Sequence, residues 1–217
     1  VEDVAGGNDT YRFERVFTRP SGNEIWLGGT AAIVAQGSGQ PRILLVQIDD
    51  VTARKDAERE LRHHAAHDPL TGLPNRRLLQ HRFVKVLERT QATGRPGALL
   101  FCDLNHFKLV NDRYGHEAGD RALREIADRL SAGVRHGDTV ARLGGDEFAV
   151  LAEDIAGDDL DTLISRLEAA VSVPLPNIEV EITTSVGTVP ITPTSTDLDA
   201  LLHQADQAMY ATKHHRG

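Results

Sequence analysis

A run of six uncharged residues, Gly97 to Cys102, ends at the carboxylate of Asp103. A continuous apolar run of this length is typical of a strand that lies in the middle of a sheet and is buried on both faces. Helices must then cover both faces of the sheet, because neither face can be left to water. The run therefore predicts a layered fold of helices and strands, with Asp103 at one end of a central strand.

The residues after position 67 alternate between helical and strand patterns. Helices are predicted where apolar residues recur every three or four positions, and strands where short apolar runs end in turn residues. The predicted strands are 97–102, 139–143, 148–151 and 178–189, and the predicted helices are 78–89, a short one that contains Lys108 and Asn111, one around 123–130, 160–171 and 198–212. From the central strand onward we expect the order β-α-α-β-β-α-β-α, which indicates an α/β (α+β) sandwich with a central mixed sheet flanked by helices.

Residues 1–52 have the pattern of β-structure. Polar and apolar residues alternate over 11–17, and apolar segments at 24–27 and 43–48 complete a predicted antiparallel meander of three strands. Residues 53–66 then carry a thin stripe of alanine and leucine among charged residues, which predicts a linker helix. This helix could be a solvated connector or one half of a short parallel coiled coil, and the pattern leaves both open.

The composition excludes several classes of protein. No stretch of the 217 residues approaches the ~20 apolar residues of a membrane helix, and no signal peptide is visible at the acidic N-terminus. The single cysteine, Cys102, excludes an internal disulfide and a four-cysteine zinc site. A net charge of −8 argues against a nucleic-acid partner. We therefore expect a cytoplasmic protein with no membrane segment in this chain.

Three carboxylates are predicted to meet at one edge of the sheet. Asp103 ends the central strand, and Asp146 and Glu147 follow Gly144 and Gly145 in the turn of a predicted hairpin. Neighbouring carboxylates repel one another unless a cation lies between them, and few hard oxygen ligands suit Mg²⁺ or Mn²⁺. Glycines in a tight turn also let a phosphorylated substrate approach the backbone. A plain glycine turn with solvated acids is the alternative.

Polar residues after the central strand could hold a nucleotide. Lys108 and Asn111 are three positions apart and share one helical face, so the ammonium group of Lys108 could reach a phosphate. The Asn111 amide and the Asp120 carboxylate match the edge of guanine, where N1–H and the 2-amino group are donors. Adenine lacks this pair of donors. A lone lysine or asparagine is usually solvated, so the interpretation depends on the neighbouring residues.

Taken together, these segments resemble the GGDEF-domain diguanylate cyclases. The motifs that carry the resemblance are His67 to Arg77, Asp103 to Asp120, Arg142 to Phe148, Thr184 to Gly187 and Ala205 to Lys213. They occur in the family's order and cover residues 67–217. The resemblance implies the palm-like fold that nucleotidyl cyclases share with polymerases. It also implies that two GTP are condensed into cyclic di-GMP with release of two pyrophosphates.

The resemblance implies a role for each matching residue. Asp103, Glu147 and the carbonyl group of Leu104 would hold two Mg²⁺ (or Mn²⁺) ions per active site, and Asp146 or Glu147 would assist deprotonation of the attacking hydroxyl. The implied substrate-binding residues are Lys108 and Lys213 for the phosphates, backbone amides of 104–107 including Phe107, the turn glycines Gly144 and Gly145, and Asn111 and Asp120 for guanine. Each domain would hold one GTP, so catalysis would require a homodimer.

A second site is implied by Arg135 and Asp138, which match the family's Arg-x-x-Asp site for inhibition by cyclic di-GMP. Arg166 lies where the family often adds another arginine. The alternative is a surface ion pair worth ~0–1 kcal/mol. Asn105 departs from the family pattern, because many members have a second aspartate there, but we expect activity to survive.

Residues 1–52 resemble the C-terminal part of a PAS domain. The run Gln47 to Thr52 is similar to the exit strand and Asp-x-Thr junction that lead into a PAS signalling helix. The resemblance implies three parts: a partial PAS sensor (1–52), a signalling linker helix (53–66) and a GGDEF domain (67–217). Because the strands and helices that complete a PAS pocket are missing, we expect neither haem nor flavin. Two other functions stay open, a catalytically silent effector that binds GTP or cyclic di-GMP, and a cyclase that acts on ATP.

Overall fold

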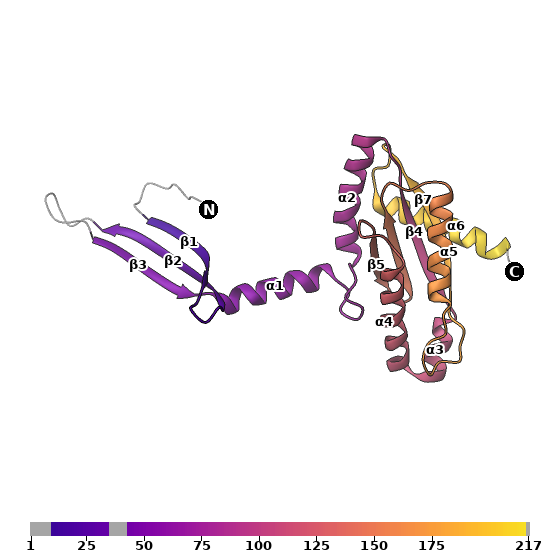
Figure 1. Ribbon diagram of the computed structural model, residues 1–217, viewed down its shortest axis with the longest axis horizontal. Helices are drawn as coiled ribbons and strands as arrows, with labels where there is room; N and C mark the ends of the chain where they lie inside the picture. Colours follow the sequence, from indigo (N-terminus) through magenta and orange to yellow (C-terminus); the bar gives the residue numbers. More distant parts are fainter. Residues whose placement is uncertain (1–9, 35–42, 216–217) are drawn as a thin grey trace. The chain divides into compact units, whose positions relative to one another are not determined.

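The computed structural model describes residues 10–34 and 43–215, and the chain divides into two compact units, residues 1–63 and 64–217 (Figure 1). The sequence Gly37-Ser38-Gly39 predicts a loop before the third strand, and these residues lie outside the described ranges. No helix within the described ranges is both long enough and apolar enough to cross a membrane. Each unit has its own sheet, so the two are described separately.

The first unit contains the predicted three-stranded antiparallel sheet. It is built from β1 (Thr10–Thr18), β2 (Glu24–Val34) and β3 (Ile43–Asp50) in the order β1-β2-β3. The register places Phe17 opposite Ile25 and Gly29 opposite Ile48, so one face of the sheet is mainly apolar. Phe17 is 45% exposed and Ile48 56% exposed, which shows that the described residues leave part of this face uncovered.

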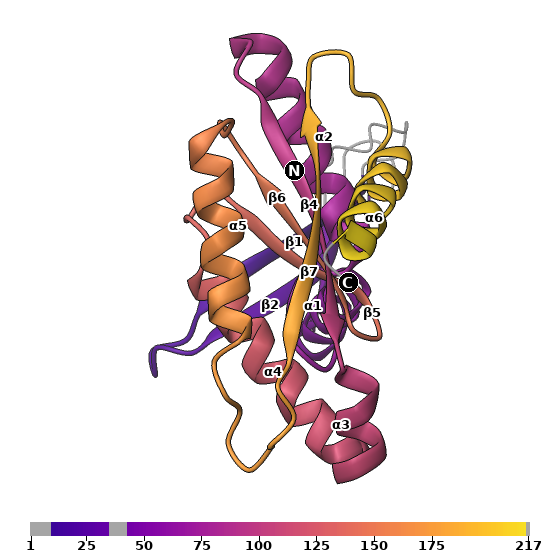
Figure 2. The same cartoon turned by 90° about the vertical axis from the view of Figure 1, so that its right-hand side faces the viewer.

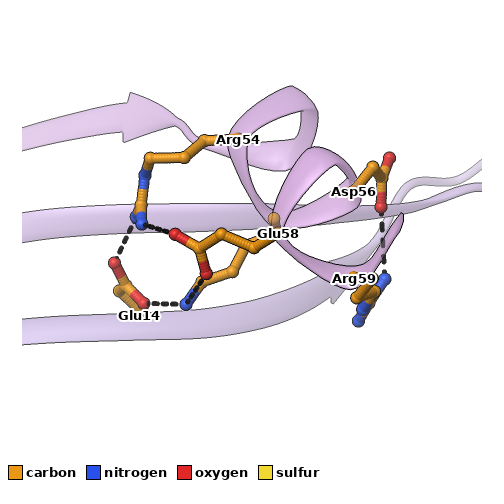
Figure 3. Close-up of polar contacts among 6 residues, drawn as sticks. Glu14, Arg54, Asp56, Glu58 and Arg59 are labelled. Carbon is orange, nitrogen blue, oxygen red and sulfur yellow. Dashed lines mark hydrogen bonds and ion pairs between the residues drawn. The ribbon is translucent and has the colours of Figure 1, made fainter. Parts of the chain in front are cut away.

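Helix α1 (Thr52–Ala66) begins directly after this sheet and is tied to it by charged side chains (Figure 3). The carboxylate of Glu14 pairs with Arg54 and, at 2.5 Å, with the Nζ atom of Lys55. Lys55 also lies over the ring of Trp26, 5.5 Å from its centroid. Thr52 is the first residue of the helix, and its hydroxyl accepts the N–H of Trp26 at 2.9 Å.

The second unit contains the predicted succession of helices and strands. Its elements are α2 (Arg76–Thr93), β4 (Gly97–Asn105), α3 (Phe107–Tyr114), α4 (His116–Ala132), β5 (Thr139–Gly144), β6 (Glu147–Ala152), α5 (Asp158–Val171), β7 (Thr183–Ile191) and α6 (Leu198–His215). The order β-α-α-β-β-α-β-α from the central strand is confirmed. The sheet order is β5-β6-β4-β7, with β4 in the middle as expected.

Two details of the predicted sheet are wrong. The sheet is not mixed, because every strand pair in it is antiparallel. The predicted strand at 178–189 begins only at Thr183: Ile178 and Val180 alternate with polar residues and pack against the core, but they pair with no strand. Apolar alternation reports which side chains are buried, whereas pairing and direction depend on a partner strand elsewhere in the chain.

Both faces of β4 are buried, as its apolar run predicted. Leu100 and Cys102 belong to a core formed with α3, α4 and α5, and neither has any exposed surface. Leu99 and Phe101 face the opposite way and pack with α2 and α6. Figure 2 shows α5 and α6 on opposite sides of the sheet. Because helices pack on both faces of β4, the residues at the end of this strand are held in a fixed position.

Helix α6 packs directly against the backbone of β7 at Gly187. A Cβ atom at this position would lie 1.9 Å from the carbonyl oxygen of Ala205, so any side chain would separate helix and strand. Gly187 ends the motif Thr184 to Gly187 quoted above. The glycine therefore sets how close α6 lies to the sheet.

Candidate active site

The turn between β5 and β6 is a tight hairpin, as the Gly-Gly-Asp-Glu sequence predicted. Gly144 and Glu147 pair across the end of the ladder, which leaves Gly145 and Asp146 as the two central turn residues. Gly145 has a φ of 51°, a left-handed conformation that favours glycine at this position of a two-residue turn. The turn therefore presents two acidic side chains from a short and well-defined backbone.

The register of the sheet brings Asp103 and Glu147 together. They are directly opposite each other on β4 and β6. Opposed residues of an antiparallel pair point to the same face with Cβ atoms roughly 4.5–5.5 Å apart. Next to them, the N–H of Leu104 donates to the carbonyl oxygen of Asp146 at 3.3 Å. The carboxylates of positions 103 and 147 thus lie side by side at the end of the central strand.

Burial and neighbouring negative charges raise the pKa of the Glu147 carboxyl. Burial makes the largest contribution, followed by the charges of Asp103, Asp146 and Asp206, while Arg76 acts in the opposite direction. Within the described part of the chain, no three His, Cys, Asp or Glu side chains are grouped so as to hold a metal ion. Carboxylate and main-chain oxygens are hard donors, a type that fits Mg²⁺ or Mn²⁺.

Helix α3 begins immediately beyond these carboxylates. His106 precedes it with a φ of 65°, and the first turn of a helix has N–H groups without intrahelical acceptors. The side chain of Phe107 is only 8% exposed and packs in the core, so only its backbone can reach a ligand. The N–H of Leu104 is already used by Asp146, which removes it from the predicted row of phosphate-binding amides. The side chain of Lys108 is exposed.

Asn111 lies on α3 and Asp120 on α4. The two helices are joined by Gly115, whose φ is 81°. Asn111 is half-buried between the helices, and Asp120 is exposed near the start of α4, one residue after Gly119. Lys213 lies in α6, but its side chain is outside the described part of the structure.

Comparison with known proteins decides the family. The model of the family described as "Diguanylate cyclase, GGDEF domain" matches residues 65–217. The chain belongs to the GGDEF-domain family. This match includes the turn at 144–147 and the end of β4, so the site described above is the family's signature region in this chain.

Relatives of the GGDEF domain differ in the activities that their names state. The chain is 43% identical over 164 residues to the bifunctional diguanylate cyclase/cyclic di-GMP phosphodiesterase MucR of Pseudomonas aeruginosa, covering 75% of this chain and 24% of MucR. It is 34% identical over 218 residues to the cyclic di-GMP phosphodiesterase PdeR of Escherichia coli, covering 93% and 32%. The chain thus spans a third or less of the length of these relatives.

A solved structure with the same fold contains a bound nucleotide. It is the coiled coil and GGDEF domain of DgcB from Caulobacter crescentus in complex with c-di-GMP, with a TM-score of 0.68 and 26% identity, and the match covers 76% of this chain and 88% of that one. The α+β fold of this GGDEF domain, with its antiparallel sheet and flanking helices, is therefore that of solved family members.

The GGDEF turn is held by Arg142, for which the sequence predicted no role. The guanidinium group of Arg142 donates to the carbonyl oxygen of Gly145 from Nη2 at 2.7 Å and from Nε at 3.1 Å. Its Nη1 atom pairs with Asp68 at 2.8 Å, and Thr71 donates to the same carboxylate from its hydroxyl at 2.7 Å. Asp68 is 74 residues from Arg142 in sequence, so only the fold brings them together.

These contacts lower the pKa of Asp68. Burial alone would raise it, but the hydrogen bonds from Thr71 and Arg142 and the charge of Arg142 outweigh the burial. The motif His67 to Arg77, which contains Asp68, is therefore electrostatically coupled to the GGDEF turn. The signal for this contact in the sequence was an arginine inside an otherwise apolar strand segment.

The departure at Asn105 has a structural explanation. Its Nδ2 atom donates to the hydroxyl oxygens of Thr183 and Ser185 at 3.0 Å each. Both partners lie on β7, next to the end of β4. The amide of Asn105 therefore joins two strands beside the site by donating hydrogen bonds. An aspartate carboxylate at this position could accept hydrogen bonds but could not donate them.

The predicted inhibitory residues lie around the end of α4 and on α5. The carboxylate of Asp138 accepts the N–H groups of Arg135 at 3.0 Å and Glu153 at 3.2 Å. Arg135 is exposed, and Arg166 is exposed on α5. No ion pair joins Arg135 to Asp138 in the described part of the chain, so the surface-pair alternative has no support there. Asp138 has a backbone-capping role that sequence reasoning missed.

Proposed function

We propose that this GGDEF domain is a diguanylate cyclase that condenses two GTP into cyclic di-GMP and releases two pyrophosphates. The observation that carries the proposal is the pairing of Asp103 with Glu147 beside an intact Gly-Gly-Asp-Glu turn. Two neighbouring carboxylates at this edge could hold the cations that a triphosphate requires. Membership of the family and the bifunctional name of MucR support the same activity.

Two Mg²⁺ (or Mn²⁺) ions fit the oxygen donors of the site, with Asp103, Glu147 and the carbonyl group of Leu104 as the residues that would hold them. When bound, such ions lower the pKa of an attacking hydroxyl and neutralise a triphosphate. The chain would supply the remaining contacts. Lys108 and Lys213 would hold the terminal phosphates, together with N–H groups at the start of α3.

Base recognition and proton transfer are assigned to residues near these carboxylates. Asn111 on α3 and Asp120 on α4 would orient guanine by hydrogen bonds to its edge. Gly144 and Gly145 would let the nucleotide lie against the backbone of the turn, since a side chain at either position would stand in its way. Asp146 and Glu147 both remain candidates for taking the proton from the attacking 3′-hydroxyl.

One domain would bind one GTP, so the reaction would need two copies whose sites face each other. We propose that residues 53–66 carry a signal into the domain 67–217 from a partial PAS sensor at 1–52. The ion pairs of Glu14 with Arg54 and Lys55 support this role, because they tie the start of α1 to the sheet (Figure 3). The exposed Leu61, at 69%, leaves room for a helix partner in the dimer.

Incubation of the purified chain with GTP and Mg²⁺ should yield cyclic di-GMP and pyrophosphate, detected by chromatography. Replacing Mg²⁺ with a chelator should stop the reaction. GTP binding by a dimer without any product would instead favour the silent effector. Equal turnover of ATP would favour a different nucleotidyl cyclase.

Arg135→Ala is expected to relieve product inhibition. The guanidinium group is exposed and could donate to a phosphate or guanine of cyclic di-GMP, and losing a charged hydrogen bond of this kind should raise the inhibitory concentration roughly 10-fold or more. Initial rates should stay near those of the wild type, because Arg135 lies outside the proposed catalytic site. Asp138 is a poorer probe, since its carboxylate also caps backbone amides.

The measurement is the initial rate of GTP turnover at increasing concentrations of added cyclic di-GMP. Arg95→Ala removes an exposed arginine elsewhere on the domain and is the matched control. Unchanged inhibition in Arg135→Ala would show that the Arg-x-x-Asp segment does not bind the product.

A further inference from the structure

Gly119 stands in the first turn of α4, at a position where a glycine needs an explanation. Glycine in a helix costs about 1 kcal/mol relative to alanine, because it has more backbone freedom to lose. Gly119 is buried, so solvent exposure does not explain it. What explains it is the space that its missing side chain leaves.

That space is filled by the side chain of Asn111. A Cβ atom on Gly119 would lie 2.0 Å from the Oδ1 atom of Asn111, 3.0 Å from its Cγ atom and 3.3 Å from the Cζ atom of Phe107. The first two distances are shorter than van der Waals contact allows. Any residue other than glycine would therefore force the Asn111 amide out of its place between α3 and α4.

Packing against Gly119 is also what holds Asn111. In the described part of the chain, the Asn111 side chain makes no hydrogen bond to another residue. Its amide is therefore left available for a ligand, and its position depends on the surface that α4 offers. That surface is the bare backbone of Gly119, and the next residue is Asp120.

We propose that Gly119 is a positioning residue for recognition of the nucleotide base. It acts through Asn111, by letting this amide lie on the backbone of α4 next to the Asp120 carboxylate so that both address one base edge. The inference rests on the proposed function, because it takes Asn111 and Asp120 as the groups that select guanine. Gly119 itself touches no substrate.

Gly119→Ala is expected to raise the KM for GTP roughly 10-fold and to leave kcat within about twofold, because one hydrogen bond to the base is lost while the reacting groups stay in place. The preference for GTP over ATP should fall by a similar factor. The matched control is Gly133→Ala at the other end of α4. An added Cβ there meets the Cδ2 atom of Leu167 at 3.0 Å and does not approach Asn111, so KM should not change.

A double-mutant cycle separates positioning from a general loss of structure. With Asn111→Ala in place, the collision with the amide is gone, so adding Gly119→Ala should change neither KM nor the melting temperature by much. The double variant also keeps the test valid if Gly119→Ala alone unfolds. A full further rise in KM in the Asn111→Ala background would overturn the proposal.

A structural readout separates this inference from the proposed function. The side-chain amide NMR signal of Asn111 should shift in Gly119→Ala and stay in place in Gly133→Ala. If Gly119→Ala keeps the GTP affinity and base preference of a wild type that makes cyclic di-GMP, the inference is wrong and the function stands. If the wild type neither binds nor turns over GTP, the proposed function fails, and the inference falls with it.

Discussion

Glu147→Gln should reduce the formation of cyclic di-GMP by roughly 10³-fold or more while the domain stays folded. Glu147 lies opposite Asp103 at the end of the central strand, so the change removes one of two carboxylates that would hold the metal ions. Losing a group that stabilises developing charge commonly costs about 10²–10³ in rate, and a metal ligand should cost at least as much. Chromatography of the reaction with GTP and Mg²⁺ measures the effect.

The same variant should be slightly more stable than the wild type when no metal is present. The pKa of Glu147 is raised by burial and by its acidic neighbours. Its contribution to stability is therefore full below the pKa of an unfolded glutamate, about 4.3, and is lost as the pH rises through the folded value. Glutamine carries no charge at either pH. The melting temperature of Glu147→Gln should therefore exceed that of the wild type at pH 7, and the two should approach each other near pH 4.

Glu153→Gln is the control, because this glutamate lies just beyond the other end of β6 and pairs with the exposed Arg89. It should keep the wild-type initial rate. Retained turnover in Glu147→Gln would remove Glu147 from the metal site and contradict the proposed mechanism.

Arg142→Met should destabilise the domain by about 3 kcal/mol, since removing one partner of a buried ion pair leaves the other uncompensated. The side chains of Arg142 and Asp68 are only 10% and 18% exposed. For a domain of this size the melting temperature should fall by roughly 6–12 °C. Turnover should fall too, because the carbonyl group of Gly145 loses both donors and the turn that carries Asp146 and Glu147 is no longer held.

Arg89→Met is the matched control for Arg142→Met. Arg89 pairs with two carboxylates, those of Glu153 and Asp154, but its side chain is 55% exposed. Such a surface pair contributes about 0–1 kcal/mol. Thermal unfolding followed by circular dichroism compares the two variants. Equal losses of stability would show that the contact of Arg142 with Asp68 stabilises the domain no more than an exposed ion pair does.

The pH dependence provides a second check on the Arg142 contact. Burial alone would raise the pKa of Asp68, but hydrogen bonds from Thr71 and Arg142 lower it overall. A lowered carboxyl pKa contributes stability above the unfolded value of about 3.9, and this stability is lost as the pH falls through the folded value. The stability gap between the wild type and Arg142→Met should therefore narrow below about pH 4.

The candidate site could be predicted from local sequence to the extent that its groups are neighbours in the chain. The hairpin turn, the carboxylate at the end of the central strand and the helix after it all depend on a few consecutive residues. Asp103 and Glu147 were expected to meet if their strands were neighbours, and the register confirms that they do. The roles of Lys108, Asn111, Asp120 and Arg135 stay predictions.

By itself, the sequence determined the helices and strands, their order and the family, because periodicity and motifs act over short stretches of chain. Only the tertiary structure decided the strand directions, the late start of β7, the contact of Arg142 with Asp68 and the fit of Asn111 against Gly119. Each of these depends on atoms from segments that approach only after folding. A local pattern records which side chains must be buried, but not which distant backbone will cover them.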